Sequence, residues 1–102
     1  MKLFYSKKLE FADGDSVRIP INHAETGDIA PSELWVYTED GNYSITATIG
    51  ESEVAVEKGI DMGSFALADT ASEDRMLYII SDASAIEISA SGDTTLEVKV
   101  IY

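Results

Sequence analysis

The chain has 102 residues, no cysteine and a formal net charge of −12 at pH 7. This length predicts one domain, and the absence of cysteine excludes disulfides, thiolate metal ligands and cysteine catalysis. The acidic surface would repel nucleic acid and anionic lipid, so we expect neither as a partner. No apolar run reaches the roughly 20 residues of a membrane span, so no membrane-spanning segment is expected.

A basic first strand is predicted for residues 2–8, which contain Lys2, Phe4, Lys7 and Lys8. The first eight residues hold no acid, so their charge of +3 leaves −15 for the rest of the chain. Two interpretations remain open: ordinary solubility, or a basic arm that binds an acidic surface such as a second copy of the chain. Because no apolar signal core follows the lysines, we expect no secretion by a cleaved signal.

A turn at residues 13–15, with the sequence Asp-Gly-Asp, separates this strand from a second one at residues 16–21, where apolar and polar residues alternate. Pro20 cannot donate a hydrogen bond to a neighbouring strand, which places this strand at an edge or a bulge. Residues 22–32 predict a long loop, a candidate interaction surface. His23, the only histidine, lies here without a set of partner ligands, so we expect it to be solvated.

An Asp-Gly pair at positions 40 and 41 lies between two alternating runs, which is a strong hairpin signal. A two-residue loop would pair Val36 with Ile45 and turn Trp35 and Tyr37 toward the other face. Two alternatives remain for these aromatic residues. Either a second element covers them as part of the core, or they form an exposed platform for a partner or ligand.

Four further segments are predicted between this hairpin and the C-terminal one. Residues 53–57 form a short strand, and residues 60–68 form a short strand or an irregular wall. Residues 69–74 form a polar connection that could hold one helical turn. Residues 75–81 hold a continuous apolar run, which predicts a strand that is buried on both faces or lies at a subunit contact.

The C-terminal segment, residues 85–102, predicts a second hairpin around Gly92, with a three-residue loop that pairs Ile88 with Val98. Seven to nine short strands separated by Gly, Asp, Asn and Ser turns therefore predict an all-β fold with little helix. The expected architecture is an antiparallel β-sandwich, with the jelly roll as one form of it, in a single domain spanning residues 1–102.

The sequence lacks the motifs that usually accompany catalysis. It has no phosphate-binding glycine loop, no nucleophile elbow and no zinc-binding histidine pair. The turns at residues 13–15 and 40–42 offer Asp and Asn oxygens that could bind calcium, but neither continues into a full acidic calcium loop, and turns favour these residues in any case. We therefore expect no enzyme activity, no cofactor and no metal.

In size, acidity, strand pattern and richness in Ala, Ser, Thr and Gly, with a basic arm and an aromatic pair, the chain resembles the small all-β capsid decoration (cement) proteins of tailed bacteriophages. The resemblance implies a non-catalytic homo-oligomer, often a trimer, that binds the subunits of a protein shell and stabilises it. It also implies a location in the virion, after assembly in the host cytoplasm. The contact residues that we expect are Lys2, Phe4, Lys7, Lys8, Trp35 and Tyr37.

Two other classes of function are weighed against this one. The alternative is a carbohydrate-binding β-sandwich module, in which Trp35, Tyr37 and Tyr43 would stack on sugar rings. A cupin-type enzyme or small-molecule binder is disfavoured, because such sites need several histidines and this chain has one.

Overall fold

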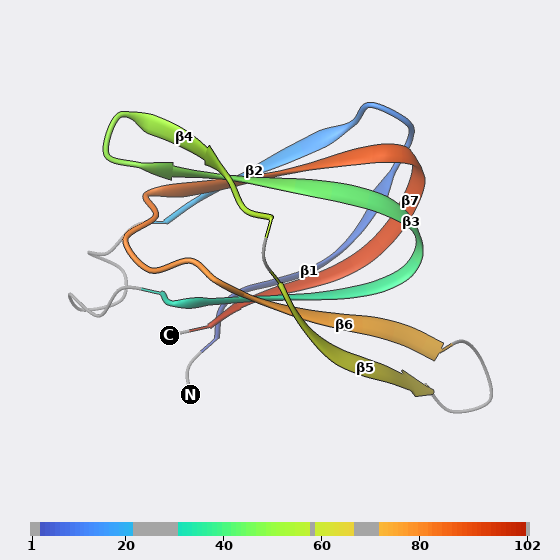
Figure 1. The fold of residues 1–102 in the computed structure, drawn as a ribbon. Helices are drawn as coiled ribbons and strands as arrows, with labels where there is room; N and C mark the ends of the chain where they lie inside the picture. The colour runs from blue at the N-terminus through green and yellow to red at the C-terminus, as the bar shows by residue number, and fades with distance from the viewer. Residues whose placement is uncertain (1–2, 22–30, 58, 67–71, 102) are drawn as a thin grey trace.

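The structure is a computed structural model that describes residues 3–21, 31–57, 59–66 and 72–101. These residues form one antiparallel sheet, and no helix occurs among them, which confirms the predicted all-β antiparallel class. The strands are β1 (Leu3–Phe11), β2 (Ser16–Pro20), β3 (Glu33–Ile49), β4 (Ser52–Ala55), β5 (Ile60–Ala66), β6 (Ser72–Ile79) and β7 (Ala85–Ile101) (Figure 1).

Two long strands, β3 and β7, determine the shape of the sheet. Each has 17 residues, and they pair with each other from Glu33 opposite Ile101 to Thr48 opposite Ala85. The register shifts twice between Thr38 and Asn42, and both ribbons fold back at this point (Figure 1). Since a bulge bends a strand without ending it, the sheet turns over on itself into two arms.

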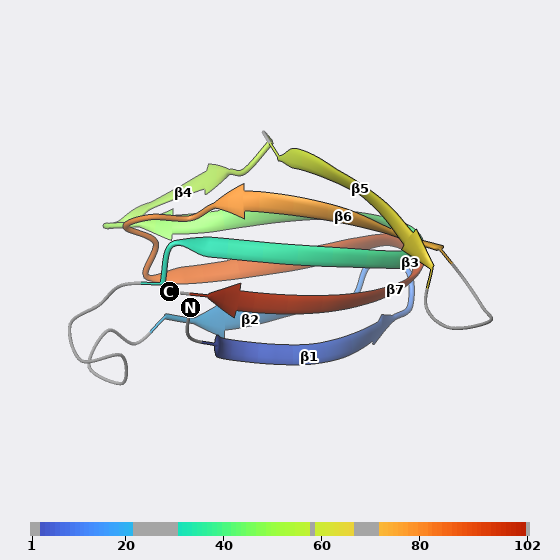
Figure 2. The same ribbon diagram turned by 90° about the horizontal axis from the view of Figure 1, so that it is seen from below.

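The two arms are named here after their outermost strands. The β5 arm contains β1, the second half of β7, the first half of β3, β6 and β5, in that order (Figure 2). The β4 arm contains β2, the first half of β7, the second half of β3, and β4. The two layers expected of a sandwich are thus formed here by one continuous folded sheet.

Both predicted hairpins are wrong. Val36 pairs with Val98, and Ile45 pairs with Ile88, whereas the hairpins would have paired Val36 with Ile45 and Ile88 with Val98. The Asp-Gly and Gly-Asp signals mark bends in continuous strands, so β3 and β7 are also longer than the short strands expected. Each half of β3 has a neighbouring strand on both sides, β7 and β6 in one arm and β7 and β4 in the other, so backbone groups at both of its edges are hydrogen-bonded.

Three of the predicted turn signals meet at the folded end of the sheet. The turn at residues 13–15 joins β1 to β2 there, beside the bends of β3 and β7. Gly92 N donates to Asp13 Oδ1 at 2.8 Å, and Ala12 N donates to Asp15 Oδ2 at 3.0 Å. These carboxylates therefore fix the turn and attach it to β7.

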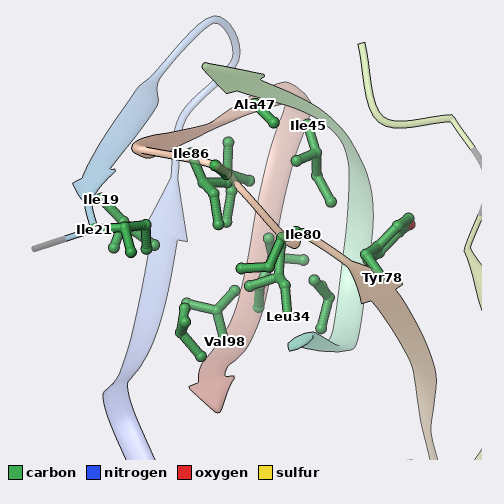
Figure 3. Close-up of a cluster of buried hydrophobic side chains, with 14 of the residues drawn as sticks. Ile19, Ile21, Leu34, Ile45, Ala47, Tyr78, Ile80, Ile86 and Val98 are labelled. Carbon is green, nitrogen blue, oxygen red and sulfur yellow. The ribbon is translucent and has the colours of Figure 1, made fainter. Parts of the chain in front are cut away.

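The hydrophobic core lies between the two arms. Because side chains alternate along a strand, each long strand sends every second residue inward. Leu34 and Val98 come from the β5 arm, and Ile45 and Ile86 come from the β4 arm, and their side chains meet in the space between (Figure 3). Complete burial of such a side chain stabilises the fold by roughly 1.5–3 kcal/mol, so these contacts hold the folded sheet closed.

Strand β6 corrects two further expectations. It begins at Ser72, inside the segment predicted as a connection. Its apolar run is not buried on both faces, because Tyr78 and Ile80 are buried whereas Ile79 is 59% exposed. Only one face of β6 is covered by the other arm. The edge position predicted for the second strand is confirmed, since β2 pairs with β7 alone among the described strands. Of the loop predicted for residues 22–32, only residues 31 and 32 are described, and they belong to no strand.

Candidate functional site

Trp35 and Tyr37 lie on the outer face of the β5 arm, the face turned toward the viewer in Figure 2. Their neighbours Leu34 and Val36 are fully buried on the inner face, so the alternation of β3 directs the two aromatic side chains outward. Both aromatic residues are half-buried, and neither belongs to the core cluster. The pair therefore lies outside the core cluster, and part of each residue is accessible on the outer face.

The two rings are held in a fixed arrangement. Their centroids are 6.4 Å apart and their planes differ by 22°, which is a stacked geometry. Trp35 Nε1 donates to Glu33 Oε1 at 3.0 Å, and Lys99 Nζ lies 5.2 Å from the centroid of the Tyr37 ring. A ring that is already ordered loses little conformational entropy when a partner covers it, which suits a contact surface.

Apolar residues from two neighbouring strands extend this aromatic pair. Ile60 on β5 pairs with Leu77 on β6, and Leu77 pairs with Trp35 on β3, so one row crosses three strands. Ile79 lies two residues beyond Leu77 on the same face. Ile60 and Ile79 are 52% and 59% exposed. The name outer patch is used below for the following set: Trp35, Tyr37, Ile60, Leu77 and Ile79.

Sequence reasoning found only the aromatic half of this patch. The alternation within residues 75–81 separates Leu77 and Ile79 from the buried Tyr78 and Ile80, and that signal could have been used. It could not place them beside Trp35, because the pairing of β6 with β3 joins segments about forty residues apart.

Charged side chains surround the outer patch. In the row of Tyr37, the paired residues are Arg75 on one side and Glu97 on the other, with Lys8 beyond Glu97. Lys99 Nζ lies 3.6 Å from Glu97 Oε1, and Lys8 Nζ lies 3.4 Å from Glu39 Oε1. Exposed pairs of this kind add little stability, but a mixed rim around an apolar centre is typical of protein contact surfaces.

The N-terminal residues predicted to join this surface are only partly gathered there. Lys7 and Lys8 are both exposed but project from opposite faces of β1. Lys7 pairs with Val98, whose side chain points into the core, whereas Lys8 pairs with Glu97, whose side chain points to the outer face. Phe4 is half-buried and packs against the core cluster. Lys2 lies outside the described residues. Among the described members, Lys8 is the one that shares the face of Trp35 and Tyr37.

Tyr43 does not join the aromatic pair. It lies beyond the bend of β3, in the β4 arm, and its hydroxyl lies 2.8 Å from the hydroxyl of Tyr78 in the β5 arm. The two rings meet edge to face, with centroids 6.4 Å apart. Burial raises the pKa of Tyr43 well above its ordinary value of 10.0, and the bond to Tyr78 raises it further. Tyr43 therefore bridges the two arms, and the three-ring sugar platform is not assembled.

Two clefts lie between β4 and β6, at one side of the core that fills the space between the arms. One, of about 380 Å³, is lined by apolar residues that include Ile49, Val54 and Ile80. Its neighbour, of about 330 Å³, is lined by Tyr43 and Tyr78. Val56, which lines both, donates its backbone N–H to Ile45 O at 2.9 Å and so attaches the start of the β4–β5 connection to the β4 arm.

In one of the two turns considered for calcium, at residues 13–15, the carboxylates bind backbone groups. Both oxygens described above, on Asp13 and Asp15, accept amide hydrogens of the chain itself. Within the described part of the chain, no group of three or more His, Cys, Asp or Glu side chains is arranged to hold a metal ion. His23 lies outside that part, so its predicted solvation is not addressed by the structure.

Comparison with known proteins finds no family model, no curated protein and no solved structure that matches this chain. None of the described residues belongs to a helix that could cross a membrane. The functional argument therefore rests on the outer patch and its surroundings.

Proposed function

We propose that the protein is a non-catalytic assembly protein that binds other proteins through the outer patch. The observation that carries this proposal is the row from Ile60 through Leu77 to Trp35, which extends an ordered aromatic pair across three strands of the outer sheet face. Contiguous exposed apolar residues inside a polar rim are typical of protein interaction sites, and tryptophan and tyrosine often carry most of the binding energy there.

The partner that we propose is a protein shell, with the chain acting as a virion capsid decoration protein. The support is the resemblance in size, acidity and strand pattern, together with a patch on a rigid sheet rather than in a deep cavity. Many copies arranged on one shell would bind by avidity, so each contact can be weak and small. On this proposal the protein works as an oligomer and is located in the virion.

The test is the mass of the native particle with which the protein sediments, followed by variants of the patch. We expect a multi-megadalton shell, and we expect Trp35→Ala and Leu77→Ser to lower the number of copies retained on it. Val54→Ser is the matched control, because Val54 is an exposed apolar residue on β4, away from the patch. Native protein that sediments only as a small soluble species would contradict the proposal, as would equal losses for the control.

A second candidate is carbohydrate binding, favoured by one observation: the half-buried rings of Trp35 and Tyr37 on the outer face have planes that differ by only 22°, and aromatic rings are surfaces on which sugars stack. Trp35 is the only tryptophan, so its fluorescence reports directly on that surface. A saturable change with one member of a glycan panel, lost in Trp35→Ala, would support this candidate. An unchanged spectrum across the panel would exclude it for the glycans used.

A further inference from the structure

The inner face of the β4 arm is incompletely covered along its last strand. Val54 on β4 pairs with the buried Ala47 on β3, so both side chains point toward the other arm. Ile49 lies two residues beyond Ala47, on the same face. Val54 and Ile49 are nevertheless 46% and 44% exposed. Two apolar side chains on the core side of the sheet are therefore only half covered by the described part of the chain.

These two side chains line the cleft of about 380 Å³ between β4 and β6. Its wall on the β6 side includes Ile80 and Ala83, in the turn that follows β6. Apart from Glu57 and Ser81, every described residue that lines the cleft is apolar. Small-molecule sites in proteins have volumes of roughly 300–1,000 Å³ and are mostly apolar, with a few polar groups. The cleft has the size and the lining of such a site.

Backbone hydrogen bonds hold the wall on the β6 side in place. Ile80 N donates to Ser32 O at 2.9 Å, and Ala83 N donates to Ile80 O at 3.1 Å. Ser84 N donates to Thr48 O at 2.8 Å, which attaches this turn to β3. The wall on the β4 side is attached to β3 by the strand pairing. A site whose walls are fixed beforehand loses little conformational entropy when a ligand enters.

The charged residues of the segments around this cleft are acids. Glu57 is the one charged residue among the described residues that line it, and it also lines the neighbouring cleft. Glu51, Glu53 and Asp82 are exposed in the same segments. Across residues 44–57 and 79–85, the chain has no lysine, arginine or histidine. An anionic ligand would therefore be repelled here, whereas a positive group would be attracted.

We propose that this cleft binds a small amine, with its apolar body against Val54 and Ile80 and its ammonium group beside Glu57. Burial of apolar surface supplies most of the attraction, and the carboxylate selects the positive group. The inference goes beyond the proposed function, because it concerns a small ligand and a site between the arms rather than the outer face. Ile79 is the one residue of the outer patch that also lines the cleft, so the variants below leave it unchanged.

The test is a titration of the ¹⁵N-labelled full chain with octylamine, followed by the NMR chemical shifts of the backbone amides. We expect saturable shifts centred on residues 54–57 and 80–83. Octanol, which has the same alkyl chain without the charge, should bind about three- to fivefold more weakly, the effect of one partly exposed charge pair. Octanoate should bind more weakly still, because its charge is repelled. Added salt should weaken the binding of octylamine and leave that of octanol unchanged.

Glu57→Gln tests the charge without changing the shape of the side chain. It should raise the dissociation constant of octylamine about three- to fivefold and leave that of octanol unchanged. Glu10→Gln is the matched control, because it makes the same change on β1, and it should alter either constant by less than about 1.5-fold. Lys58 follows Glu57 in the sequence and lies outside the described residues, so its charge is tested by Lys58→Gln, which should leave octylamine binding equal or tighter.

Val54→Phe tests the cleft itself, because the larger side chain fills it. The variant should lose the saturable shifts with both octylamine and octanol, and circular dichroism checks that it is folded. The absence of saturable shifts with octylamine, equal affinity for octanol or octanoate, or unchanged binding in Val54→Phe would each overturn the amine site. Self-association of the wild type that Val54→Phe abolishes would identify a second copy as the occupant and would also overturn it.

The two proposals fail separately. Val54→Phe should be retained on the shell like the wild type, because Val54 lies on β4, away from the outer patch. Trp35→Ala should bind octylamine like the wild type, because Trp35 does not line the cleft. Loss of octylamine binding in Trp35→Ala would overturn the placement of the amine between the arms.

Discussion

Thr94 on β7 holds the backbone of Asn42 on β3 at the fold of the sheet. Asn42 N donates to Thr94 Oγ1 at 3.2 Å, and the same hydroxyl oxygen lies 3.0 Å from Asn42 O, within donating distance. Thr94 is the one polar residue among the buried side chains described, with 2% of its surface exposed. The two strands shift register here, so a side-chain hydroxyl satisfies backbone groups that the regular ladder does not.

Replacing Thr94 with valine should therefore lower stability without changing side-chain shape. The variant removes the acceptor of the Asn42 amide in a partly buried hydrogen bond, and we expect the free energy of unfolding in urea to fall by about 0.5–1.5 kcal/mol. Thr95→Val is the matched control, because its side chain points to the other face and is partly exposed, and it should stay within about 0.5 kcal/mol of the wild type. Equal effects of the two variants would contradict the role of Thr94.

Gly41 should be the most sensitive glycine at the bend. Its φ angle is +89°, and a Cβ atom there would overlap Thr94 Oγ1 and the backbone of Asp93. Gly14 has nearly the same φ, +85°, but open space around it. We expect Gly14→Ala to cost about 1–2 kcal/mol through its backbone angle alone, and Gly41→Ala to cost about 1–3 kcal/mol more through overlap. Equal urea midpoints for the two variants would show that the close approach is relieved without cost.

The hydroxyl contact between Tyr43 and Tyr78 should couple the two arms. Tyr43→Phe and Tyr78→Phe should each destabilise the fold by about 0.5–1.5 kcal/mol, since each leaves the other hydroxyl without this partner. The double variant should cost less than the sum of the single changes, because one bond is lost in all three cases. Strict additivity in chemical denaturation would show that the hydroxyls contribute independently.

Alkaline pH should weaken the fold through Tyr43. Burial raises its pKa above the ordinary value of 10.0, with further increases from Tyr78 and Asp74 and an opposing effect of a hydrogen bond to Thr38. The folded state therefore holds this proton more tightly than the unfolded state. Its contribution to stability is complete below about pH 10 and is lost as pH rises above that value. Urea denaturation between neutral pH and pH 11 should show a steeper decline for the wild type than for Tyr43→Phe.

Trp35 should report the state of the outer patch. Because it is the only tryptophan and is half-exposed, acrylamide should quench the fluorescence of the free protein readily. Quenching should fall, and emission should move to shorter wavelength, when the patch is covered in a native particle.

The faces of the strands were readable from the sequence. Alternation assigned Leu34 and Val36 to one face of their strand and Trp35 and Tyr37 to the other, and the structure keeps both assignments. Side-chain direction depends only on the two-residue period of an extended backbone, so it needs no knowledge of the pairing partner. The aromatic half of the outer patch was found for the same reason.

Strand pairing was decided by the tertiary structure. A glycine with positive φ allows either a reversal of the chain or a bend in a continuous strand, and alternation continues on both sides in each case. Val36 could therefore meet Ile45 through a local turn or Val98 across the sheet, and composition does not distinguish the two. The choice depends on satisfying backbone groups along 17 residues at once, which only the complete set of partners provides. That choice also placed Leu77 beside Trp35 and separated Tyr43 from both.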